Sequence, residues 1–306
     1  MRFTLQLPTD KVTLASEFLT GAAIAEMARA AEDAGFDAAF VTDHPAPSER
    51  WLATGGHHSL DPFVALSFAA AATERLRLQT HVLIAAYRNP FLVAKAIASL
   101  DVLSGGRTIV GIAAGYLEPE FAALGACFEE RNELADELLS ALRRIWSEPG
   151  IALEGRHFHA SGIRALPRPL QAPHPPLWVG GNSRRAIRRA VELGDGWLPF
   201  SAPGKMASRV GTAALESEDD LMRGISYARA HAQQVGRSAP LDICFSPFGL
   251  DMRADGLPAP ESVLAAANRL GALGVTWLVI TLPCASRAEF CQRAGWFGRE
   301  VIARAG

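Results

Sequence analysis

Residues 177–185 read Leu-Trp-Val-Gly-Gly-Asn-Ser-Arg-Arg and continue into the helical pattern of residues 186–191. A short apolar run, typical of a buried strand, ends in two glycines, which allow a tight turn and a close approach of the backbone to a ligand. The helix that follows directs unpaired N–H groups and the positive end of its dipole into this turn. Together these features predict a phosphate site. An ordinary strand-to-helix loop, with Asn182 or Ser183 as the N-cap, explains the same pattern equally well.

The same strand-then-helix unit recurs along the chain. Strands are expected at 3–7, 36–42, 76–84, 108–114, 177–180, 196–200, 241–248 and 275–282. Helices are expected at 17–34, 61–73, 89–103, 133–147, 183–193, 216–235, 260–273 and 286–304, with a shorter one at 118–124. This alternation predicts one closed (β/α)8 TIM barrel over residues 1–306. An open dinucleotide-binding sheet is the alternative, but no Gly-x-Gly-x-x-Gly follows the first strand.

The alternation is interrupted at residues 148–176. Residues 152–158 predict a hairpin, and five prolines between 167 and 176 predict an ordered segment that is not helical. No change of composition separates two domains here. We therefore expect an insertion within a single barrel domain.

Composition and charge exclude several kinds of partner. The chain has 306 residues, a net charge of −2 and no basic run longer than Arg184-Arg185, which argues against nucleic acid. Charged residues interrupt every apolar segment before it reaches the length of a membrane span, so no membrane partner is expected. Residues 1–7 read as a strand rather than a signal peptide. The four cysteines lack a Cys-x-x-Cys pair and metal-ligand spacing, so we expect buried free thiols in a cytoplasmic protein.

In a barrel of this type, reactive groups lie where the strands end. The second strand ends at Thr42-Asp43-His44 and the third near His81-Val82. The fourth ends at Gly115-Tyr116, and the fifth at the glycine turn 180–183. These positions are the candidates for the functional site.

Several segments together carry a family resemblance. They are Phe-Val-Thr-Asp-His at 40–44, Thr-Glu-Arg-Leu-Arg-Leu at 73–78, Tyr-Arg-Asn-Pro at 87–90, Leu-Asp-Val-Leu-Ser-Gly-Gly-Arg at 100–107, Gly-Ile-Ala-Ala-Gly-Tyr at 111–116, Pro-Leu-Trp-Val-Gly-Gly at 176–181 and Gly-Asp-Gly-Trp at 194–197. The set resembles the bacterial-luciferase-like oxidoreductases, and within them the branch that uses the deazaflavin coenzyme F420. The resemblance covers residues 3 to about 200 and concerns only the topology beyond them.

The resemblance implies a cofactor in the barrel mouth, either coenzyme F420 or, as the alternative, FMN. Its phosphate tail is expected near the glycine turn, in agreement with the phosphate site derived above. The implied cofactor-binding residues are Thr42, Asp43, His81, Val82, Arg88, Gly115, Gly180, Gly181, Asn182 and Ser183. A non-proline cis peptide at His81-Val82, behind the ring, and a homodimer are also implied. A partner flavin reductase is needed only if FMN is the cofactor, and no metal is expected.

His44 is the predicted catalytic residue. An imidazole, whose ordinary pKa is close to neutrality, suits a proton transfer that accompanies movement of a hydride. The alternative is that His44 only caps its strand and shapes the loop. Adjacent strand residues point to opposite faces, so Asp43 is expected to make a structural hydrogen bond. A metal site of His44, His57 and His58 lacks the usual ligand spacing.

The basic residues near the mouth have two interpretations each. Arg88 either faces the acidic tail of the cofactor or braces its own loop. Arg184 and Arg185 lie in the first turn of a helix, where positive charge opposes the dipole unless an anion is bound nearby. His81 is expected to contribute backbone shape rather than to transfer a proton.

The remaining candidates concern the substrate. Tyr116 stands where the sugar-phosphate dehydrogenases of the family carry a catalytic carboxylate, so a sugar phosphate is not expected here. Glu118 and Glu120 are expected to cap the short helix. The predicted function is transfer of a hydride between F420 and a small organic substrate. The alternatives are an FMN-dependent monooxygenase that uses oxygen, and a barrel that binds the cofactor without catalysis.

Overall fold

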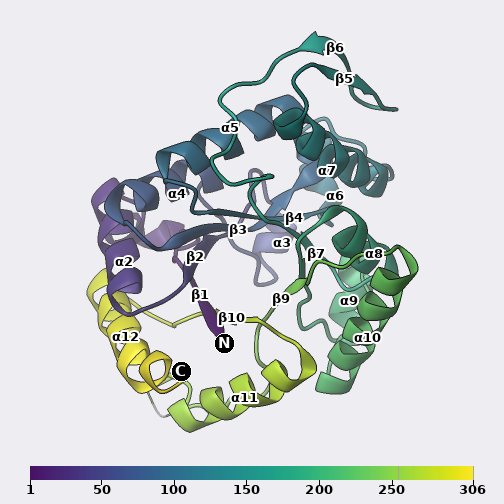
Figure 1. The fold of residues 1–306 in the computed structure, drawn as a ribbon. Coiled ribbons are helices and arrows are strands. Elements are labelled where there is room, and N and C mark those ends of the chain that lie inside the picture. The colour runs from purple at the N-terminus through teal and green to yellow at the C-terminus, as the bar shows by residue number, and fades with distance from the viewer. Residues whose placement is uncertain (254, 306) are drawn as a thin grey trace.

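The computed structural model describes residues 1–253 and 255–305. Its parallel strands close into a barrel in the order β1-β10-β9-β8-β7-β4-β3-β2. These strands are β1 (Arg2–Gln6), β2 (Ala38–Val41), β3 (Arg77–Ile84), β4 (Thr108–Ala113), β7 (Leu177–Gly180), β8 (Gly196–Leu198), β9 (Asp242–Phe245) and β10 (Trp277–Ile280). Each overlaps a predicted strand, so the predicted TIM barrel is confirmed (Figure 1).

Helices surround the strands in a ring (Figure 1). They are α2 (Gly21–Asp33), α4 (Pro62–Ala72), α5 (Pro90–Leu103), α7 (Arg131–Ser147), α8 (Arg184–Leu193), α10 (Glu218–Gln234), α11 (Pro260–Leu273) and α12 (Arg287–Glu300). Local signals set their starts. The Asp61 carboxylate accepts hydrogen bonds from the N–H groups of Phe63 and Val64, and the Asn89 side chain caps α5 in the same way.

Shorter elements account for most differences from the prediction. The helix expected at 17–34 is divided into α1 (Ala15–Phe18) and α2, because the Thr20 side chain accepts the N–H of Ala23 and starts a new helix. Additional short elements are η1 (Val12–Leu14), α3 (Glu49–Leu52), η2 (Ala85–Tyr87), α9 (Gly204–Val210) and η3 (Ile302–Arg304). The short helix expected at 118–124 is present as α6 (Glu118–Ala123). The strands expected at 196–200 and 241–248 end earlier, at Leu198 and Phe245.

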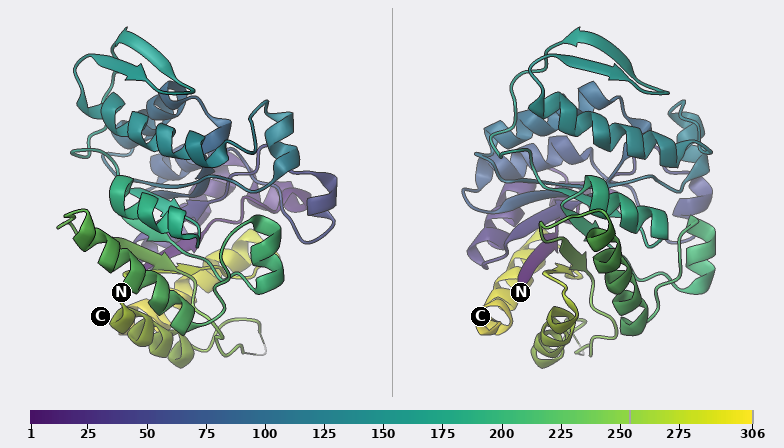
Figure 2. Two further views of the ribbon diagram at one scale, coloured as in Figure 1. Left: turned by 90° about the vertical axis from the view of Figure 1, so that its right-hand side faces the viewer. Right: turned by 45° about the vertical axis from the view of Figure 1, so that its right-hand side comes forward.

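The insertion forms a separate two-stranded sheet of β5 (Ile151–Glu154) and β6 (His159–Ile163). The second strand therefore lies beyond the predicted hairpin range. The hairpin lies at the periphery, outside α5 and α7 (Figure 2). The Glu137 carboxylate of α7 accepts the N–H groups of His157 and Phe158, which fixes the hairpin to the outer layer of helices. The site described below lies instead where the barrel strands end.

No helix in the described part of the chain is both long and apolar enough to span a membrane. The four cysteines are free. Cys244 and Cys284 are buried as expected, whereas Cys127 is exposed, because it lies in the turn between α6 and α7 rather than in the core. The prediction of buried thiols is therefore wrong for Cys127.

Candidate active site

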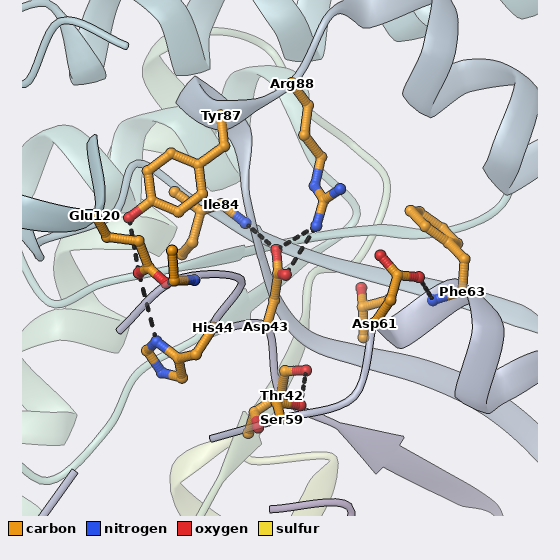
Figure 3. Close-up of polar contacts among 12 residues, drawn as sticks. Thr42, Asp43, His44, Ser59, Asp61, Phe63, Ile84, Tyr87, Arg88 and Glu120 are labelled. Atoms are coloured by element: carbon orange, nitrogen blue, oxygen red, sulfur yellow. Dashed lines mark hydrogen bonds and ion pairs between the residues drawn. The ribbon is translucent and has the colours of Figure 1, made fainter. Parts of the chain in front are cut away.

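Asp43 and His44 follow the end of β2, and their side chains diverge (Figure 3). One Arg88 amino group donates to both oxygens of Asp43, at 2.8 and 2.7 Å, and the N–H of Ile84 donates to the same carboxylate at 3.1 Å. Asp43 therefore makes the expected structural hydrogen bonds. Arg88 uses this amino group to brace the loop after β3. Of its two interpretations, this is the one in which Arg88 stabilises its own loop rather than facing the cofactor.

His44 faces a buried carboxylate on α6 (Figure 3). Its Nδ1 lies 3.6 Å from Oε2 of Glu120, whose side chain is 1% exposed. The Tyr87 hydroxyl donates to the same oxygen at 3.0 Å, and the N–H of Ala46 donates to the other oxygen at 2.9 Å. Glu120 thus joins the ends of β2, β3 and β4 and does not cap its own helix, so that expectation is wrong.

Hydrogen bonds keep Glu120 ionised in spite of its burial. Burial alone would raise the pKa of this carboxyl, but the groups of His44, Ala46 and Tyr87 that point at it hold the pKa below its ordinary value. Burial and the adjacent carboxylate raise the pKa of Tyr87, which therefore stays a donor. Nδ1 of His44 thus lies beside a buried carboxylate, at 3.6 Å from Glu120 Oε2, and has no hydrogen-bond partner in the described residues.

Three aromatic side chains lie close to the ring of His44. The centroid of its ring lies 4.4 Å from that of Trp51, 4.8 Å from that of His57 and 6.5 Å from that of Tyr116. His57 Nδ1 lies 2.8 Å from the His58 carbonyl oxygen, and burial lowers the pKa of His57. In the described residues, no three His, Cys, Asp or Glu side chains gather in a way that suits a metal ion. The imidazole of His44 is thus a polar group packed among aromatic rings.

The peptide bond His81-Val82 is cis, as the resemblance implied. The pairing of β3 with β4 shifts its register between Thr80 and Leu83, so the strand bulges at this bond. His81 is partly exposed, but the surrounding protein still removes most water from its ring. This loss of solvation lowers the pKa of His81 to about 4. His81 therefore stays neutral near physiological pH, which agrees with the expectation that it does not transfer a proton.

The glycine turn lies across the mouth, after β7. Gly181 has a φ of +119°, a conformation that favours glycine, and its carbonyl accepts the indole N–H of Trp197 at 2.8 Å. The Asn182 amide donates to the carbonyls of Phe200 and Ala213, and its carbonyl oxygen accepts the N–H of Phe200. The Asn182 side chain thus braces the turn and offers a ligand nothing further.

Ser183 is the N-cap of α8, and its hydroxyl accepts the N–H of Ala186 at 3.2 Å. Arg185 pairs with Glu133 and Asp136 of α7, at 2.9 and 2.7 Å. The positive charge of Arg185 is therefore balanced by protein carboxylates, and it does not count as an indication of phosphate. Arg184 instead lies over the ring of Tyr227 and makes no ion pair within the described part of the chain.

The mouth also contains features that fit a bound ring system. The buried Thr42 hydroxyl oxygen has no partner in the described residues. A Cβ at Gly180 would lie 3.3 Å from the Ala113 side chain, and one at Gly115, where φ is +90°, would lie 2.6 Å from the Ile84 side chain. These glycines therefore allow close packing of the strand ends against neighbouring side chains. The assignment of these residues to a cofactor stays a prediction.

Glu120 and Tyr87 are the residues that sequence reasoning did not assign to the site. The hydrogen bond from Ala46 to Glu120 spans 74 positions, so no local pattern connects them. One signal was available, because Glu120 precedes Phe121 on a short helix that directly follows a strand end, and both are buried there.

Comparisons with known proteins agree with this architecture. The family model described as luciferase-like monooxygenase matches residues 1–246. An F420-dependent glucose-6-phosphate dehydrogenase of Beutenbergia cavernae is 35% identical over 314 residues, covering 90% of each chain. An FMNH2-dependent dimethylsulfone monooxygenase of Pseudomonas putida is 29% identical, over 70% of this chain and 56% of that protein. The crystal structure of monooxygenase RslO1 from Streptomyces bottropensis has the same fold, with a TM-score of 0.81, 21% identity and full coverage of both chains.

Proposed function

We propose a function from the premise that this chain belongs to the luciferase-like monooxygenase family. The chain is an oxidoreductase, the type of enzyme to which its relatives belong. We propose that it transfers a hydride between coenzyme F420 and a small organic substrate in the barrel mouth. The observation that carries this proposal is the pairing of His44 with the buried Glu120 carboxylate at the rim.

His44 moves the proton that accompanies the hydride. For an alcohol substrate, Nε2 of His44 accepts the hydroxyl proton while the hydride leaves the carbon, and in the reverse direction it returns the proton to the carbonyl oxygen. The Glu120 carboxylate stabilises the resulting imidazolium through Nδ1, at 3.6 Å. Tyr87 and the N–H of Ala46 hold this carboxylate in place. Coenzyme F420, when bound, supplies the acceptor and donor of the hydride.

Two observations favour F420 as the cofactor, one from a relative and one from the structure. One relative that aligns over 90% of its own length is an F420-dependent glucose-6-phosphate dehydrogenase. The glycine turn and the segment that Asn182 ties to it, residues 200–213, carry the exposed cations Arg184, Lys205 and Arg209, which pair with no described carboxylate. These cations suit an acidic tail. The N–H groups at the start of α8 would hold its phosphate, and Thr42 the ring.

The substrate we propose is a small, uncharged alcohol or carbonyl compound. The open side of His44 is lined by the rings of Trp51, His57 and Tyr116, and burial keeps His57 neutral. The family resemblance implies that Tyr116 stands where the sugar-phosphate dehydrogenases carry a carboxylate. Such a wall favours apolar over charged substrates.

Separate titrations with F420 and with FMN, followed by fluorescence, test the cofactor. We expect micromolar binding of F420 and reduction of bound F420 by a secondary alcohol. Binding of FMN without F420, with oxygen consumption once a flavin reductase is added, would instead support an FMN-dependent monooxygenase like the Pseudomonas putida relative. Tight F420 binding without turnover of any alcohol, imine or enone would identify a non-catalytic barrel.

A homodimer is the assembly we propose. The side chains of Val64, Phe68 and Leu92 on the neighbouring helices α4 and α5 are 58, 49 and 73% exposed. Exposed apolar side chains on adjacent helices mark an interface. Sedimentation analysis should give twice the chain mass of 32.7 kDa, and Phe68→Glu should give a monomer. A wild-type monomer would contradict the dimer.

A further inference from the structure

A column of polar side chains runs through the barrel interior beneath the mouth. The Thr4 hydroxyl of β1 donates to the Gln79 carbonyl oxygen of β3 at 2.8 Å. Because β2 lies between these strands, this bond must cross the inside of the barrel. Thr4 and Gln79 are both fully buried, so water does not replace their contacts.

Gln79 also determines which nitrogen of His81 carries the proton. Its amide nitrogen lies 3.1 Å from His81 Nδ1. With its carbonyl oxygen held by Thr4, Gln79 presents an N–H donor to Nδ1, which must then be an acceptor without a proton. A neutral imidazole keeps one proton, so this proton is on Nε2.

The Nε2 side of the ring opens toward the mouth. Nε2 has no hydrogen-bond partner in the described residues, and it is not among their buried polar atoms without a partner, so it reaches open space. Below it the interior is closed by fully buried side chains, among them Gln79 and Trp178. Phe40 packs beside the imidazole, with 4.7 Å between the ring centroids. The bulge at residues 81–82 lies beyond Gln79 along β3, toward the end of this strand.

We propose that His81, fixed by Gln79 and Thr4 as the Nε2–H tautomer, is a hydrogen-bond donor to the ring system bound in the barrel mouth. Gln79 and Thr4 act as positioning residues. They hold the imidazole in one tautomer before the ligand arrives, so binding does not require a proton to be moved. The inference rests on the proposed function for the identity of the ring that meets this donor.

Nitrogen-15 NMR of the cofactor-free protein tests the tautomer without any measurement of activity. His81 should show a protonated Nε2 and a bare Nδ1. His174 provides the opposite standard in the same spectrum, because its Nδ1 lies 2.9 Å from the Pro175 carbonyl oxygen and must carry the proton. A protonated Nδ1 on His81 in the wild-type protein would overturn the proposal.

Variants of Gln79 test the positioning role. Gln79→Glu replaces the donor by an acceptor of the same shape, so it should move the His81 proton to Nδ1 and weaken F420 binding about three- to tenfold. Gln79→Leu removes both bonds and should give a mixture of tautomers. Thermal unfolding identifies variants that fail to fold, and His174 should keep its pattern in all of them. An unchanged His81 tautomer in folded Gln79→Glu would contradict the role of Gln79.

Replacement of His81 tests the donor itself. The side-chain nitrogen of His81→Gln can reach the position of Nε2, whereas that of His81→Asn falls short near the position of Nδ1. F420 affinity should therefore be kept in the glutamine variant and fall about three- to tenfold in the asparagine variant. Equal affinities would count against a donor at Nε2. A wild-type protein that binds no F420 overturns the proposed function, whereas one that binds F420 with His81 protonated at Nδ1 overturns only this inference.

Discussion

The ends of β2 and β7 face the same barrel mouth but use their residues differently. After β2, both oxygens of Asp43 bind Arg88, while the next residue, His44, directs Nδ1 at Glu120 and stays partly exposed. After β7, the side chain of Asn182 is fully occupied by the loop at 200–213. One end therefore presents reactive side chains, and the other presents backbone.

We propose that proton transfer takes place at the β2 end and that the β7 end anchors the cofactor. A side chain that transfers a proton needs a free nitrogen and a nearby charge, which His44 and Glu120 provide. An anion is held well by backbone N–H groups at a helix start, which residues 183–185 at the start of α8 would provide. Variants at the β2 end should change turnover, and variants at the β7 end should change cofactor affinity.

The largest effect is expected from His44→Ala. Loss of the proton-transferring group should lower kcat about 10²- to 10⁴-fold, while the Kd for F420 stays within about twofold of the wild-type value. Stopped-flow reduction of bound F420 by the alcohol measures the step. His58→Ala, in the same loop but with an exposed side chain, is the control and should keep wild-type turnover. Full turnover of His44→Ala would remove this residue from the mechanism.

Glu120→Gln should lower kcat by about 10- to 100-fold, because the imidazolium loses its charged partner. The folded-state pKa of Glu120 is below its ordinary value, so the ionised form stabilises the fold above about pH 4.5. The stability difference between wild type and variant should shrink as the pH falls through that lowered pKa. Urea unfolding from pH 3 to pH 7 measures it, with the exposed Glu118→Gln as control. A difference that grows in acid would contradict the assignment.

Gly181→Ala should act on binding instead of turnover. Its φ of +119° strains any residue with a Cβ, so the turn must shift and the Kd for F420 should rise about tenfold at nearly constant kcat. Gly236→Ala introduces a similar strain after the end of α10, because Gly236 has a φ of +68°. The added Cβ would have no neighbouring atom within 4 Å. It should lower stability without a change in Kd. A loss of kcat in Gly181→Ala at saturating F420 would break the separation between the two ends.

Arg184→Gln should give the smallest change. Removal of an exposed cation near the turn should weaken F420 binding about two- to fivefold and reduce its dependence on salt. Arg188→Gln is the matched control, because Arg188 is exposed on the same helix and donates to Tyr227. Binding measured between 20 and 500 mM NaCl compares the two. Equal losses would show only a general effect of charge on α8.

The barrel was predictable from sequence because its signals are local. Apolar runs mark the strands, and Asp61-Pro62 and Asn89-Pro90 mark helix starts. The position of His44 followed from the same logic, since a strand end places its residues at the rim. The division of the helix expected at 17–34 was missed because the Thr20 cap lies inside an apolar pattern that continues on both sides.

The partners of the site residues were not predictable in the same way. Glu120 reaches His44 across three strand ends, and Asp136 reaches Arg185 across 49 positions. The charge on Arg185 indicated an anion, but a sequence cannot tell a protein carboxylate from a phosphate when the carboxylate lies on a distant helix. Local sequence patterns therefore predicted which residues lie at the barrel mouth, but not which of them form hydrogen bonds or ion pairs with one another.

A crystal structure with F420 bound tests the separation of the two ends most directly. We predict that the phosphate tail accepts hydrogen bonds from the N–H groups of residues 183–185, and that the ring lies beside His81-Val82 with Nε2 of His44 facing the substrate pocket. A tail bound away from the glycine turn, or a ring out of reach of His44, would contradict it.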